Sequence, residues 1–169
     1  PILTNLSSVE HFCPLNIWVS RALKALNLNS NNLGNEGARV LCEALKHNTA
    51  LESLNVGNPN GSSSGDIKAE GARYFADMLK VNRALNTLDL SNNNIGGVSG
   101  YIKKDELQGT SSKKGDTVQY NGQQCIVFME EDGDGDLKVQ NISGVVAIEA
   151  LAGALKFNRA LTSVNLLRN

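Results

Sequence analysis

Residues 85–93 read LNTLDLSNN, and three further segments share their spacing of apolar residues. The related segments are 23–31 (LKALNLNSN), 51–59 (LESLNVGNP) and 161–169 (LTSVNLLRN). Each has the pattern apolar-x-x-apolar-x-apolar, and three of the four carry Asn at the ninth position. A pattern that recurs along a chain indicates a repeat architecture.

One period accounts for the spacing of these segments. Their first leucines lie 28 residues apart between Leu23 and Leu51, 34 apart between Leu51 and Leu85, and 76 apart between Leu85 and Leu161. The sequence therefore predicts a 28-residue unit, with a short insertion near residues 58–66 and a long one at 97–143.

Each unit is predicted to hold one strand and one helix. The apolar-x-apolar core favours a short parallel strand, in which Leu26 and Leu28 point inward. Apolar residues at helical spacing follow in 37–45, 71–79 and 147–155. In the first of these helices the predicted buried stripe is Ala38, Leu41, Cys42 and Leu45.

Asparagines recur at two places in the unit. The ninth-position Asn is expected to bond backbone groups where the chain leaves the strand, and Pro59 replaces it in the second unit. A second Asn follows each helix, at Asn48, Asn82 and Asn158, and predicts a left-handed helix cap.

The repeat resembles the ribonuclease-inhibitor-type leucine-rich repeats, which also occur in NOD-like receptors and Ran GTPase-activating proteins. The resemblance rests on residues 26–45 (LNLNSNNLGNEGARVLCEAL) and 88–96 (LDLSNNNIG), and it covers about 23–96 and 144–169. It implies an α/β right-handed solenoid with inner parallel strands and outer helices. Such solenoids bind other proteins on a concave sheet.

The long insertion has the pattern of a small antiparallel β module. Residues 116–120 and 123–129 read as two strands around the turn Asn121-Gly122, the strongest short signal for a hairpin. An acidic turn at 130–136 and a third strand at 137–142 follow. We therefore expect four parts: an irregular cap or divergent repeat (1–22), repeats (23–96), the insertion (97–143) and a continued, truncated repeat (144–169).

The acidic turn also suggests calcium. Asp132, Asp134 and Asp136 alternate as the acids of an EF-hand loop do. That loop needs Gly at position six and Glu at position twelve, where this chain has Leu137 and Ser143. The pattern favours a solvated turn over a calcium site.

Composition limits the function classes. The chain has 169 residues, a net charge of −1 and 41% hydrophobic residues, so its overall charge does not point to nucleic acid or an anionic membrane. Cys13, Cys42 and Cys125 form an odd set without metal-ligand spacing, which favours reduced thiols and a cytoplasmic, reducing location. The sequence contains no catalytic or cofactor motif that we recognise.

Residues 1–22 have two open interpretations, an apolar cap on the core or a docking site around Trp18.

These observations predict a non-catalytic protein–protein interaction scaffold, either a fragment or an accessory subunit of a larger assembly. The alternative is a regulatory repeat region of a GTPase-activating protein or NOD-like receptor, which the resemblance implies. Candidate contacts on the strand face and its edge are Asn27, Asn29, Asn55, Asp89, Asn165 and Arg168. In the insertion they are Tyr101 and Tyr120, and we expect the insertion to matter more because exposed aromatic rings suit interfaces.

Overall fold

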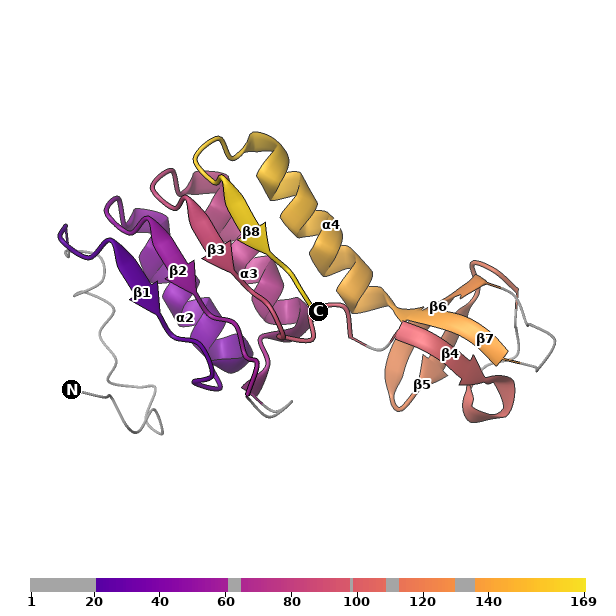
Figure 1. Ribbon diagram of the computed structural model, residues 1–169. Helices are drawn as coiled ribbons and strands as arrows, with labels where there is room; N and C mark the ends of the chain where they lie inside the picture. The colour runs from indigo at the N-terminus through magenta and orange to yellow at the C-terminus, as the bar shows by residue number, and fades with distance from the viewer. Residues whose placement is uncertain (1–20, 61–64, 98, 109–112, 130–135) are drawn as a thin grey trace.

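The computed structural model describes residues 21–60, 65–97, 99–108, 113–129 and 136–169. It shows an α/β fold with a parallel sheet on one side and helices on the other (Figure 1). The sheet has the strand order β1-β2-β3-β8. Its strands are β1 (Ala25–Asn27), β2 (Ser53–Asn55), β3 (Thr87–Asp89) and β8 (Ser163–Asn165). The helices are α2 (Gly34–His47), α3 (Lys68–Val81) and α4 (Ile142–Phe157).

Matched apolar residues set the register of the parallel sheet. Leu26 pairs with Leu54, Leu54 with Leu88, and Leu88 with Val164. Leu54 and Leu88 are fully buried, because the helices cover this face of the two central strands. The alternation inferred from the sequence is confirmed, since each central leucine points inward between two more exposed neighbours.

The helices supply the other half of the core. The predicted stripe of α2, comprising Ala38, Leu41, Cys42 and Leu45, is buried, and it belongs to the same cluster as Phe75 of α3. Leu26, Leu28 and Leu155 are only half-buried, although they pack against this cluster. Leu26 and Leu28 belong to the first described unit, and Leu155 lies on the last described helix; within the described residues, β1 has one neighbouring strand and α4 one neighbouring helix.

The helix-end asparagines contradict the predicted left-handed caps. Asn48, Asn82 and Asn158 have φ of −80°, −68° and −79° with ψ of 126°, 133° and 118°, which is extended backbone. The Oδ1 atom of Asn82 accepts from the backbone N–H groups of Ala84 (3.0 Å) and Leu85 (2.9 Å). The side chain thus closes the turn by itself, and a left-handed backbone is not needed.

The same side chains link successive units. The Nδ2 atom of Asn82 donates to the carbonyl oxygens of Leu45 (2.8 Å) and Asn48 (3.0 Å). Asn158 repeats this one unit later, donating to Leu79 at 2.8 Å and Asn82 at 3.1 Å. We call Asn48, Asn82 and Asn158 the asparagine ladder. It satisfies the last carbonyls of one helix from the side chain of the next unit.

The ninth-position asparagines behave as predicted in the third and fourth units. Asn93 Nδ2 donates to the carbonyl oxygens of Val56 (2.9 Å) and Leu90 (3.0 Å), and Asn169 Nδ2 donates to Leu90 (2.8 Å). In the second unit, where Pro59 stands, the buried side chain of Asn58 instead donates to Asp66 Oδ1 at 2.9 Å.

A second, antiparallel sheet lies between β3 and α4 in the sequence (Figure 1). Its order is β4-β7-β6-β5, with β4 (Ser99–Lys103), β5 (Thr117–Tyr120), β6 (Gln123–Met129) and β7 (Asp136–Asn141). The predicted hairpin turn is confirmed by positive φ at Asn121 (49°) and Gly122 (73°). A small core of its own consists of Val118, Cys125, Val127, Leu137 and Val139.

Two features of this sheet differ from the sequence-based expectation. Strand β4 was not predicted, because its pairing with β7 joins residues far apart in the chain, such as Gly100 and Val139. The third strand was expected to include Ile142, which instead begins α4. The side chain of Asn141 accepts from the N–H of Gly144 at 3.0 Å and starts the helix there.

Candidate interaction surfaces

Four polar residues form a row across the exposed face of the parallel sheet. Asn27, Asn55, Asp89 and Asn165 are aligned by the strand register, and we call them the strand-face row. In each, a side-chain oxygen accepts from the N–H two residues later: Asn29 (3.0 Å), Gly57 (2.9 Å), Ser91 (2.8 Å) and Leu167 (3.0 Å). The row therefore closes the turns after the strands, a structural task that the sequence analysis did not foresee.

Asp89 is the acid of the strand-face row. Partial burial by itself raises the pKa of Asp89, but hydrogen bonds from the Ser91 hydroxyl, the Ser91 N–H and the Asn165 amide outweigh it and hold that pKa below its ordinary value. The Asn165 amide lies 3.1 Å from Asp89 Oδ2. Asp89 is thus a carboxylate fixed by its neighbours at neutral pH.

The other strand-face candidates differ in exposure. Asn27, Asn29 and Asn165 are exposed, whereas Asn55 and Asp89 are half-buried. Arg168 is exposed at the edge of the sheet with φ of 57°. The strand-face row lies along one side of the parallel sheet, so the structure brings its four residues together, and it places Tyr101 and Tyr120 in the other sheet.

The two tyrosines of the insertion have different environments. Tyr101 on β4 is 53% exposed, and the Lys138 ammonium lies 5.6 Å from the centre of its ring. Tyr120 is half-buried and packs against the small core around Val118. The expectation of a freely exposed ring is therefore wrong for Tyr120, because inward alternation along β5 places it on the same side as Val118.

Several predicted features lie outside the described residues. They include Asp132 and Asp134 of the acidic turn, Trp18 and most of the expected N-terminal cap, and Cys13. Asp136 is described and begins β7, where it pairs with Lys103. Within the described ranges, no group of three or more His, Cys, Asp or Glu side chains is placed to hold a metal ion.

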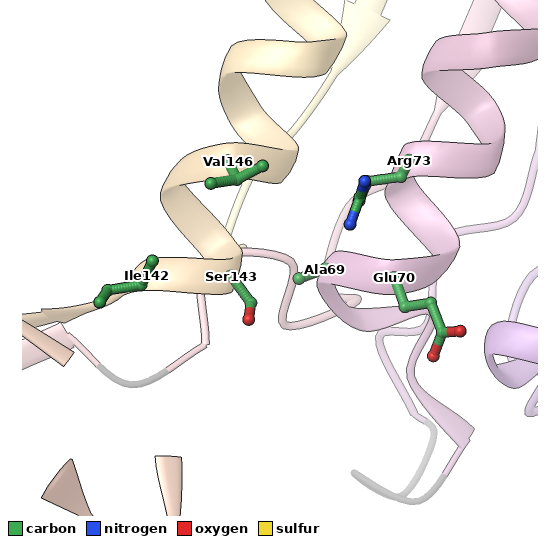
Figure 2. A pocket seen from close by; sticks show the side chains of 6 residues that line it. All are labelled: Ala69, Glu70, Arg73, Ile142, Ser143 and Val146. Atoms are coloured by element: carbon green, nitrogen blue, oxygen red, sulfur yellow. The ribbon is translucent and has the colours of Figure 1, made fainter. Parts of the chain in front are cut away.

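Figure 2 shows a pocket that the sequence analysis missed. It lies between the first turns of α3 and α4, has a volume of about 350 Å³ and is lined by Ala69, Glu70, Arg73, Ile142, Ser143 and Val146. The Glu70 carboxylate accepts a hydrogen bond from the Asn35 amide at 3.0 Å. Arg73 faces Val146 across the opening (Figure 2). The lining combines charged, polar and apolar side chains, so the pocket offers a mixed contact surface.

Both described cysteines are buried and not joined by a disulfide. Burial raises the pKa of the Cys42 thiol well above its ordinary value, and burial also raises that of Cys125. Thiols in such surroundings are poor nucleophiles. The two residues therefore act as small apolar core residues, as predicted for Cys42.

No helix in the described ranges has the length and apolar character needed to cross a membrane.

Comparison with known proteins agrees with the repeat pattern. A family model described as leucine-rich repeat matches residues 19–42, which include β1, and 81–101, which include β3. Among solved structures, the chain is similar to a Caenorhabditis elegans tropomodulin C-terminal domain, at 15% identity over 91% of this chain and 80% of that one, with a TM-score of 0.43. No curated protein matches the sequence. Leucine-rich repeats generally mediate protein–protein interactions, and this chain carries leucine-rich repeats.

Proposed function

We propose that this chain is a non-catalytic protein-binding scaffold within a larger assembly, and that its main contact is the antiparallel insertion. The observation that carries the proposal is the exposure of Tyr101, a residue that is 53% exposed and whose ring lies beside the Lys138 ammonium. A tyrosine offers a rigid apolar surface with one polar end, which suits a protein interface.

The strand-face row supports the same choice. Its side-chain oxygens each accept a backbone N–H, as Asn55 does from Gly57, so part of their capacity to accept hydrogen bonds is already used within the chain. The sheet face also lacks Trp, Tyr and Arg among its outward strand residues, and these are the types enriched at binding hot spots.

We further propose how the parts are organised. Residues 23–96 and 144–169 form one right-handed solenoid with a 28-residue period, in which 97–143 is an insertion. One continuous apolar core across α2, α3 and α4 supports this, as does the parallel register of the four strands. We also propose an intracellular, reducing location, which the free, buried Cys42 and Cys125 support.

The experiment compares immobilised baits in native extract. The baits are the intact chain, a Tyr101→Ser variant, and a strand-face variant carrying Ser53→Arg, Thr87→Arg and Ser163→Arg. Those three positions point outward beside the strand-face row without closing its turns. Quantitative mass spectrometry should show a protein that the intact chain and the strand-face variant retain and that Tyr101→Ser loses.

A conservative Tyr101→Phe bait is the matched control and should keep most of the binding. The opposite pattern, with loss only from the strand-face variant, would place the main contact on the parallel sheet and overturn the proposal.

A further inference from the structure

Two exposed apolar side chains end neighbouring helices. Val81 is the last residue of α3 and is 54% exposed, and Phe157 is the last residue of α4 and is 67% exposed. The asparagine ladder fixes these ends side by side, because Asn158 donates to the carbonyl oxygen of Asn82 at 3.1 Å. The two exposed apolar residues therefore stand on adjacent helix ends at this edge of the molecule.

Cations surround this pair. The Lys156 ammonium lies 5.8 Å from the centre of the Phe157 ring. Arg83 donates to the carbonyl oxygens of Lys80 (2.9 Å), Asn82 (3.1 Å) and Leu79 (3.3 Å), so its contacts leave the positive charge without a carboxylate. Arg159 is exposed at the same position one unit later.

The nearby acids do not neutralise these charges. Asp77, at the same end of α3, pairs with Lys80 at 2.7 Å. In the part of the chain that the structure describes, no ion pair involves Arg83, Lys156 or Arg159. We call Val81, Phe157, Arg83, Lys156 and Arg159 the helix-end patch.

We propose that the helix-end patch binds an acidic segment of a partner protein that also carries apolar side chains. The apolar pair would cover such side chains and the three cations would meet carboxylates. Charge of one sign around an apolar centre favours a partner of the opposite sign and excludes a basic one. This contact is separate from the insertion, so its test does not depend on the function proposed above.

A peptide fits this patch better than an anionic membrane does. Stable membrane attachment needs a large apolar face or many basic residues. Here the apolar part consists of two side chains, and the chain as a whole has a net charge of −1. A short acidic segment can contact the three cations alone. An anionic membrane would also bring its negative surface close to the rest of this protein, whose net charge is −1.

The test uses the full chain and a fluorescein-labelled peptide of repeated Asp-Leu-Glu-Phe, with its basic counterpart, repeated Lys-Leu-Arg-Phe. Fluorescence anisotropy should show binding of the acidic peptide, weakened by added salt. Val81→Ser combined with Phe157→Ser should weaken it by about tenfold or more. Lys156→Glu combined with Arg159→Glu should also weaken it and should strengthen binding of the basic peptide.

A matched control carries Leu167→Ser, which changes a leucine that is 63% exposed elsewhere in the parallel part. It should bind the acidic peptide as the unmodified chain does. Equal binding by the Val81/Phe157 variant would overturn the proposal. So would equal binding of both peptides by the unmodified chain, or binding to phosphatidylserine vesicles through the patch without binding to the acidic peptide.

Discussion

Gly97 and Asn141 lie against each other where the antiparallel sheet joins the parallel part: a β-carbon placed on Gly97 would sit 3.0 Å from Cβ of Asn141. The chain therefore enters and leaves this sheet at one point. Gly97 has φ of 65°, a left-handed conformation that suits glycine, and Asn141 begins α4. This narrow junction makes the insertion separable in principle.

The first prediction is that the insertion can be removed. Deletion of residues 98–140, with Gly97 joined to Asn141 through one added Gly, should leave a folded protein with cooperative thermal unfolding, measured by circular dichroism. A deletion that also removes Asn141 should be less stable by about 1 kcal/mol, because the helix loses its cap. Loss of the helical signal in the first deletion would make the insertion part of the main core.

The second prediction concerns two glycines of α4. A β-carbon at Gly144 would overlap the carbonyl oxygen of Gly96, whereas Gly153 has nothing within 4 Å. Gly144→Ala should therefore cost about 1–3 kcal/mol of unfolding free energy. Gly153→Ala should stabilise by about 0.5–1 kcal/mol, because alanine favours the helix. Urea denaturation measures both, and similar values for the two variants would contradict the close approach.

The third prediction addresses the asparagine ladder. In Asn82→Ala, two buried carbonyl groups lose the amide nitrogen that donates to them. Two backbone N–H groups also lose the side-chain oxygen that accepts from both of them. The loss of unfolding free energy should be at least about 2 kcal/mol. Asn31, which is exposed and bonds only the Asn29 carbonyl in the described part, is the control. Asn31→Ala should change stability by less than about 0.5 kcal/mol, and an equal effect would argue against the ladder.

A fourth prediction follows from the fully buried Leu88. Leu88→Ala should cost about 2–5 kcal/mol, because it leaves a cavity between the sheet and the helices. Leu167→Ala, at a side chain that is 63% exposed, should change stability by less than about 0.5 kcal/mol. A loss well under about 1 kcal/mol for Leu88→Ala would mean that the strand register is wrong.

The fifth prediction is a pH dependence. The folded-state pKa of Asp89 is lowered, so its ionised form adds stability above the unfolded-state pKa of about 3.9, and this is lost as pH falls through the folded-state value. Asp89→Asn keeps an acceptor for Ser91 but cannot ionise. The difference in unfolding free energy between the two proteins should be largest near neutral pH and shrink below about pH 4. A difference that is constant with pH would show that the charge does not matter.

The sequence was sufficient for the features that recur at a fixed spacing. The apolar pattern around Leu54 and Leu88 predicted parallel strands, and the stripe with Leu41 and Cys42 predicted the inner face of a helix. Asn121-Gly122 predicted its hairpin because a type I′ turn requires positive φ at both positions. These features are local, so a few neighbouring residues determine them.

Tertiary structure decided what depends on residues far apart in the chain. Strand β4 exists through its pairing with β7, and Tyr120 is half-buried because the small core lies on its side of β5. Asn82 combines an extended backbone, with the turn closed locally by its Oδ1, with an amide nitrogen that reaches the carbonyl of Leu45, 37 residues earlier. Local propensity favoured a left-handed cap there, but the buried carbonyls of the preceding unit needed a donor, and leaving buried polar groups unpaired costs more than the local preference gains.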